Sequence, residues 1–188
     1  SRAVSYSSDV LAYGKPEETA PQRRRIKPAD LARDAARIEL REAGSIEELP
    51  IAEGLLEDES FSGLSTLREI LDAAGAPEPC GDGASDSLEW AAKMPDVAAI
   101  MPHGMVQQAA GSDNPACAVR VVRYLTQVDV KDALQYHFTK GSQAKFEVSY
   151  KSSDTDLIKA ERAGQKMLAE IDEAQNGLRM VTLVHWKN

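Results

Sequence analysis

The chain has 188 residues, of which 43% are hydrophobic, 28% charged and 5% aromatic, and its formal net charge is −8. This composition is that of a soluble globular protein and excludes a fibrous or largely disordered chain, and no run reaches the roughly 18 apolar residues of a membrane span. The charge is unevenly distributed, because residues 28–100 carry 5 basic and 17 acidic groups, whereas residues 1–27 have a net charge of +3 and residues 101–188 of +1.

Residues 1–27 are rich in serine, proline and charged side chains and show no sustained hydrophobic period. This pattern predicts a flexible arm that becomes ordered when it binds a partner. The arm ends in a basic cluster, which consists of Arg23, Arg24, Arg25 and Lys27. Four such charges form a candidate binding site for phosphates, and the alternative is a solvated lead into the following helix.

Residues 28–80 predict a helical region. Its first helix begins at Pro28, because proline suits a first helical position, and ends at Gly44. The expected buried face of this helix consists of Leu31, Ala35 and Ile38. Apolar residues then recur at three- and four-residue steps from Leu64 onward, which predicts another helix that ends at Gly75.

A linker rich in proline and glycine, residues 76–86, is the candidate boundary to a second region. After it, residues 115–126 predict a helix, because Asn114 can cap the first turn and Pro115 needs no amide hydrogen. The same residues are rich in valine, so a strand is the alternative. A further helix is expected to begin after Asp129.

Three more elements are predicted toward the C-terminus. Residues 145–151 alternate apolar and charged side chains, which predicts a strand with one solvated face. Residues 154–175 place apolar side chains three and four positions apart, so we expect a long amphipathic helix that ends at Asn176 and Gly177. Residues 178–186 are apolar at almost every position, which predicts a central strand. This order predicts a right-handed crossover if the two strands are parallel.

Together these elements predict an α+β fold, with a helical N-terminal region followed by a small sheet packed with helices. The expected division is a flexible arm over residues 1–27, a helical region over residues 28–80 and an α+β domain over residues 81–188.

The chain has two cysteines, Cys80 and Cys117. So few cysteines argue against a disulfide framework and favour the cytoplasm or another reducing compartment, and a single bridge between the two is the alternative. Because the chain begins with Ser1 rather than methionine, we also expect a processed or truncated product.

Cys117 is a candidate nucleophile, because it falls near the start of the helix predicted after Asn114. Unpaired amides and the helix dipole favour a thiolate at such a position. His185 on the last strand is the candidate base, since papain-like and related amidase folds combine a cysteine on a helix with a later histidine on a sheet. The stretch "NPACAVR" resembles the nucleophile helix of bacterial cell-wall cysteine amidases, but no glycine–histidine turn surrounds His185.

The alternative is that Cys117 is a small buried residue and that His185 is a strand residue with a satisfied hydrogen bond. His137 is expected to be packed near the apolar face of its helix. None of the three histidines, His103, His137 and His185, has another histidine or a cysteine at the short sequence spacing that is typical of metal sites. The sequence therefore predicts no metal site. The glycine fingerprints of nucleotide-binding loops are missing as well, and we expect no cofactor.

Three functions agree with these features. We favour a non-enzymatic interaction or assembly component that docks to a protein partner through helix faces and the acidic segment, and a basic partner would complement that segment. A cysteine hydrolase of the amidase or peptidase type, with Cys117 and His185, is the second, so the sequence leaves enzymatic activity open. The third is a nucleic-acid-binding protein that combines the arm with a basic stripe. This stripe consists of Arg120, Arg123, Lys140, Lys145 and Lys151.

Overall fold

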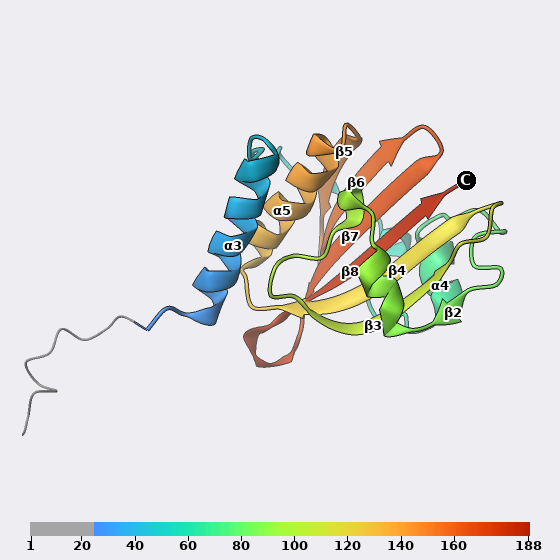
Figure 1. Cartoon of the computed structure of the whole chain (residues 1–188), viewed down its shortest axis with the longest axis horizontal. Helices are drawn as coiled ribbons and strands as arrows, with labels where there is room; N and C mark the ends of the chain where they lie inside the picture. Colours follow the sequence, from blue (N-terminus) through green and yellow to red (C-terminus); the bar gives the residue numbers. More distant parts are fainter. Residues whose placement is uncertain (1–24) are drawn as a thin grey trace, which may run out of the picture.

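The computed structural model describes residues 25–188, and its main feature is one mixed sheet of eight strands (Figure 1). The strands are β1 (Glu53–Gly54), β2 (Ser85–Asp86), β3 (Met105–Ser112), β4 (Ala118–Thr126), β5 (Glu147–Ser152), β6 (Asp156–Arg162), β7 (Gln165–Glu173) and β8 (Arg179–Lys187). Their order in the sheet is β1-β5-β6-β7-β8-β4-β3-β2. All neighbouring strands are antiparallel except β1 and β5, which are parallel.

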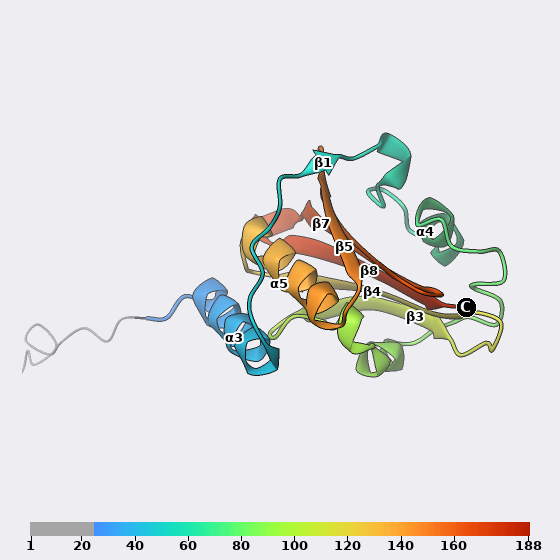
Figure 2. The ribbon, with the colours of Figure 1, turned by 90° about the horizontal axis from the view of Figure 1, so that it is seen from above.

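The helices lie on both faces of this sheet. They are α3 (Pro28–Ala43), α4 (Leu67–Ala73), α5 (Val130–Gln143) and the short 3-10 turns η1 (Glu57–Glu59), η2 (Leu88–Lys93), η3 (Asp96–Ala98) and η4 (Gln175–Gly177). Figure 2 shows α3 and α5 on one side, which we call the helical face, and α4 on the other, which we call the groove face. Within the described part of the chain, no helix has the length and apolar character that a bilayer crossing requires.

Each face of the sheet covers its own hydrophobic core. On the helical face, α5 packs directly on the sheet, and α3 packs against α5 as an outer layer. This core includes Leu40, Tyr124, Tyr136, Met167 and Leu183. On the groove face, α4 and the segment before it close a second core, which includes Phe61, Leu71, Val119, Val184 and Trp186.

A disulfide between Cys80 and Cys117 lies within the core of the groove face. It joins the loop after α4 to the residue before β4, and both cysteines are fully buried. The bridge that the sequence left as the alternative is therefore the one found, and neither cysteine is a free thiol in this structure.

The predicted fold class is wrong. The protein is α+β in the broad sense, but an eight-stranded sheet dominates it, in place of a helical region followed by a small sheet. The sheet even takes β1 from the segment predicted to be helical. The physical reason is that its central strands are buried on both faces and so lack the polar–apolar alternation that identifies a half-exposed strand.

The helix predicted over residues 115–126 is one of these strands, β4. Asn114 does not cap a helix. Its side chain accepts a hydrogen bond from the backbone N–H of Ala116 at 3.0 Å, and the N–H of Cys117 bonds back to the Asn114 carbonyl at 3.1 Å, which forms a tight turn. The valine-rich run after this turn enters the sheet, as the alternative prediction held.

The long helix predicted over residues 154–175 is also wrong, because this stretch forms the hairpin of β6 and β7. Gly164 allows the turn, since its φ of +74° lies in the region that favours glycine. Asn176 and Gly177 form the next turn, with φ values of 61° and 72°, instead of ending a helix. Strands β5 to β8 are therefore an antiparallel meander, and the predicted crossover is absent.

Several of the predicted elements are confirmed. Helices occupy Pro28–Ala43 and Val130–Gln143, and strands occupy Glu147–Ser152 and Arg179–Lys187. The expected buried face of α3 is shifted, however, because its buried residues are Ala32, Ala36 and Leu40. Leu31 and Ile38 are 47% and 57% exposed.

Candidate functional site

Cys117 and His185 lie on opposite faces of the sheet. The sulfur of Cys117 is bonded to Cys80 in the core of the groove face, where Trp186 also lies. Neighbouring residues of a strand point to opposite faces, so His185 points to the helical face. There its Nε2 lies 3.2 Å from Oε1 of Gln165, and burial lowers its pKa to about 4. The structure does not bring the two candidate residues together.

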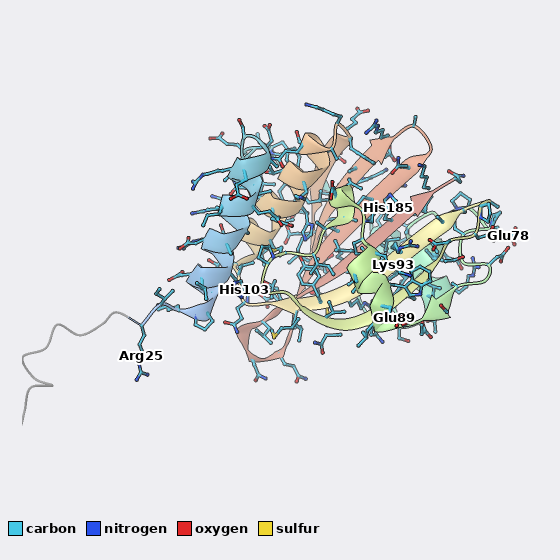
Figure 3. All side chains as sticks on the ribbon, in the orientation of Figure 1. Arg25, Glu78, Glu89, Lys93, His103 and His185 are labelled. Carbon is cyan, nitrogen blue, oxygen red and sulfur yellow. A yellow bond between two sulfur atoms is a disulfide. The ribbon has the colours of Figure 1, made fainter. Side chains whose placement is uncertain are left out.

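The basic cluster of the arm is only partly described. Arg23 and Arg24 lie outside the described residues, while Arg25 and Lys27 are exposed. Lys27 occupies the position just before α3, without a side-chain hydrogen bond to the helix. Figure 3 shows Arg25 and Glu78 on opposite sides of the described part of the chain.

The basic stripe predicted between residues 120 and 151 is divided between the two faces. On the helical face, Arg120 lies over the ring of Trp90 at 4.4 Å and pairs with Asp113 at 2.6 Å. Three positions later on the same strand, Arg123 points to the groove face, where it lines two cavities. The stripe does not form a continuous surface.

A polar row crosses three central strands on the groove face. Arg123 on β4, Thr182 on β8 and Glu170 on β7 are register partners from one strand to the next. The Nε of Arg123 donates a hydrogen bond to Oγ1 of Thr182 at 3.2 Å, and Nη2 donates to the Phe61 carbonyl at 3.3 Å. The row therefore attaches the segment that contains Phe61 to the sheet.

Glu170 makes the second attachment of that segment. Its carboxylate is only 2% exposed and accepts the backbone N–H of Phe61, at 3.1 Å to Oε1 and 3.0 Å to Oε2. The hydroxyl of Thr155 donates to the same carboxylate at 3.1 Å. Burial raises the pKa of Glu170, and these hydrogen bonds oppose that shift.

The segment held in this way forms one wall of a groove of about 1020 Å³. Its other walls are α4 and the turn between β5 and β6. We call it the acidic groove, because four of its lining residues are carboxylates. The carboxylates are Asp58, Glu69, Asp72 and Asp154, and the apolar lining consists of Leu55, Leu56, Leu64 and Ala73.

No lysine or arginine of residues 25–188 lines the acidic groove. Of the four lining carboxylates, Asp72 pairs with Arg68 at 3.7 Å, one turn away on α4. Glu69 accepts hydrogen bonds from the hydroxyl and the backbone N–H of Thr66, and these bonds lower its pKa, so its charge is stabilised. Leu56 is 64% exposed, so the groove offers both negative charge and apolar surface.

The carboxylates are not arranged as a metal centre. Across residues 25–188, no three histidine, cysteine, aspartate or glutamate side chains gather closely enough to hold a metal ion. The acidic groove is thus a surface of distributed charge, which suits an extended partner better than a single small cation.

Sequence reasoning identified the excess of acidic groups but not where they converge. Asp154 is the first residue of the long helix predicted from the sequence, whereas it contributes to the groove from a turn 82 residues or more after the other three carboxylates. Glu170 fell in the predicted helix, where a polar residue among apolar ones is unremarkable. The signal that could have found it is a charged residue inside a strand that is otherwise buried on both faces.

Comparison of the chain with protein-family models, curated protein sequences and solved structures found no match, so its function is argued from the geometry of the site alone.

Proposed function

We propose that the protein is a non-enzymatic interaction component, which docks to a protein partner by binding a basic segment of that partner in the acidic groove. One observation carries the proposal. The groove combines four carboxylates with three leucines, and no lysine or arginine lines it within residues 25–188. A segment with several positive charges and an apolar residue complements this lining in both charge and hydrophobicity.

The expected contributions to binding are individually small. An exposed ion pair contributes about 0.2–1 kcal/mol, so the four carboxylates mainly increase the association rate and select against acidic partners. Apolar burial adds about 25 cal/mol per Å², and Leu56 offers the most exposed apolar side chain of the lining. We therefore expect moderate affinity with strong dependence on ionic strength.

The groove is held in shape before a partner arrives. Phe61 is fixed by Glu170 and Arg123, as described above. Lys151 on β5 pairs with Glu59 at 2.8 Å, and β1 is hydrogen-bonded to the edge of β5 just before the wall begins. Because the wall is fixed, a bound segment does not have to supply the free energy of ordering it.

The test is the binding of a fluorescent synthetic peptide in which four arginines flank one leucine, measured by anisotropy with the full chain. We expect saturable binding that weakens by about tenfold between about 50 and 300 mM salt. A peptide with glutamates in place of the arginines should not bind. A peptide with serine in place of the leucine should bind more weakly, because it loses the apolar contact.

The matched variants change the same number of charges at two places. Asp58→Asn with Asp154→Asn removes two groove carboxylates whose side chains make no hydrogen bond or ion pair with the described residues. This double change should weaken binding about fivefold. Glu48→Gln with Glu89→Gln removes two exposed carboxylates outside the groove and should leave affinity unchanged. No binding at low salt, or equal effects of the two pairs, would refute the proposal.

The other two functions lack an observation of this kind. The hydrolase requires the thiolate of Cys117, whose sulfur is in a buried disulfide. Nucleic-acid binding requires a continuous basic surface, whereas Arg120 and Arg123 face opposite sides of the sheet.

A further inference from the structure

A second cavity, of about 600 Å³, lies on the groove face between α4 and the strands β2, β3 and β4. We call it the α4 pocket. It shares no lining residue with the acidic groove, which lies on the other side of α4. Its volume is within the roughly 300–1,000 Å³ that small-molecule sites occupy. Its lining includes Leu67, Ile70, Asp86, Ala110, Val121 and Arg123.

The floor of the α4 pocket is built from two register rows of the sheet. In one row, Asp86 pairs with Ala110, and Ala110 pairs with Val121. In the next row, Gln108 pairs with Arg123. Residues paired in this way point to the same face, so the floor is apolar at its centre and carries a negative group at one edge and a positive group at the other.

Arg123 is the feature that points to a ligand. Its guanidinium is half-buried, and among the side chains that the structure describes no carboxylate oxygen lies within 4.0 Å of its nitrogens. It uses Nε for Thr182 and one N–H of Nη2 for the Phe61 carbonyl. Of the five N–H groups of a guanidinium, three are left, including both on Nη1. Burial lowers the pKa of Arg123, and the negative charge of the nearby Glu170 opposes that shift.

We infer that the α4 pocket binds a small amphipathic monocarboxylate, with its carboxylate on Arg123 and its apolar body against Ile70, Ala110 and Val121. A carboxylate can accept two parallel hydrogen bonds from a guanidinium, and such pairs are strong where water is partly excluded. Ile70 on α4 and Ala110 on the floor are both buried, so the apolar body displaces water from apolar walls.

The charge of the lining selects a monoanion. Among the described residues of the lining, Arg123 is the one cation and Asp86 the one anion, so their formal charges cancel. A phosphate ester, which carries nearly two negative charges at neutral pH, would need a second cation. An amine would place its charge against Arg123 or would have to bind at the exposed edge near Asp86.

The test is isothermal titration calorimetry of the full chain with octanoate, 1-octanol, octylamine and octyl phosphate. We expect octanoate to bind with the highest affinity of the four. Arg123→Gln should weaken octanoate binding by about tenfold or more, because a hydrogen bond to a charged group contributes about 1.5–3 kcal/mol. Arg37→Gln, which removes a half-exposed arginine on the helical face, should leave it unchanged.

A second variant keeps the inference testable if Arg123→Gln fails to fold. Ala110→Leu enlarges a floor residue without touching the guanidinium, and Leu67→Trp narrows the roof. Both should abolish octanoate binding while circular dichroism remains that of the native protein. The inference is wrong if octanoate does not bind at millimolar concentration, if octanol binds as tightly, or if folded Ala110→Leu and Leu67→Trp bind octanoate like the unmodified chain.

Discussion

The buried carboxylate of Glu170 on β7 holds the backbone N–H of Phe61, across 109 residues of sequence, with both of its oxygens. This contact fixes the wall of the acidic groove to a central strand of the sheet. A charge at a position that is 2% exposed is costly unless hydrogen bonds compensate it, and here the compensation also positions a loop.

Removing this carboxylate should release the wall. Glu170→Ala leaves the Phe61 N–H and the Thr155 hydroxyl without their acceptor, and we expect it to lower the free energy of unfolding by about 2–4 kcal/mol. Glu170→Gln should cost less, since it keeps one acceptor oxygen and removes a buried charge. Urea denaturation gives the free energies, and hydrogen exchange of the Phe61 amide gives the local effect. Unchanged protection of that amide in Glu170→Ala would show that the contact does not hold the wall.

The disulfide should stabilise the fold and should be unreactive in the native state. Cys80 and Cys117 are 37 residues apart, and closing a loop of that length is worth about 3–4 kcal/mol in the chain-entropy description. We expect the double variant Cys80→Ser with Cys117→Ser to lose about that much in urea denaturation. Because both sulfurs are buried, dithiothreitol should free alkylatable thiols only when denaturant is also present. Rapid reduction under native conditions would contradict this burial.

A strand could be predicted from the sequence where it has one solvated face or where, as in β8, it is apolar at almost every position. The strand Glu147–Ser152 alternates, since Glu147 is exposed while Val148 and Tyr150 pack on the core of the helical face, and it was found. In β6 and β7, by contrast, Leu157 and Leu168 pack on the groove face, and Ile158 and Ile171 on the helical face. Their combined spacing imitates a helical period, so the sequence alone could not separate the two structures.

The candidate site was less accessible to sequence reasoning than the fold. Arg123 was noticed only as one of several basic residues, and the partner that sets its position, Thr182, lies 59 residues away. The excess of acidic groups in residues 28–100 was visible in the sequence. The groove that some of them line is completed by the turn that contains Asp154, which lies much later in the chain. Such convergence depends on strand order, which local pattern does not contain.

The two buried histidines should make the protein less stable as the pH falls below neutral. Burial lowers the pKa of His137 to about 3 and of His185 to about 4, so the unfolded chain takes up protons near its ordinary pKa of about 6.5 while the folded chain does not. Stability therefore increases with pH across this window. Between pH 7 and 5.5 we expect each histidine to reduce the free energy of unfolding by about 1 kcal/mol.

The measurement is urea denaturation at both pH values for the unmodified chain and for His185→Gln, which leaves a side chain able to bond to Gln165. In His185→Gln, the part of the decrease in the free energy of unfolding between pH 7 and 5.5 that the two histidines cause should be about half as large. His137→Gln should lose a similar part, although it also removes the partner of the Tyr124 hydroxyl, which lies 2.6 Å from His137 Nε2. Identical pH dependence in all three proteins would mean that neither histidine is held neutral by burial.

Gly111 on β3 should not tolerate a side chain, because the ring of Trp90 lies directly against it. A Cβ at this position would be 2.7 Å from Cδ2 of Trp90 and 2.9 Å from the Val119 carbonyl oxygen. The ring cannot move away freely, since its Nε1 donates to Ser85 at 3.2 Å and Arg120 lies over its face. We expect Gly111→Ala to lower the free energy of unfolding by about 1–3 kcal/mol.

The tryptophan provides its own readout of this clash. In a Trp186→Phe background, Trp90 is the one remaining tryptophan, and its emission should shift to longer wavelength when Gly111→Ala displaces the ring toward solvent. Gly54→Ala is the matched control, because a Cβ there meets nothing within 4 Å. Trp90 belongs to η2, so its packing between Arg120 and Gly111 fixes η2 to the helical face. If Gly111→Ala leaves both emission and stability unchanged, the ring does not pack on the strand in this way.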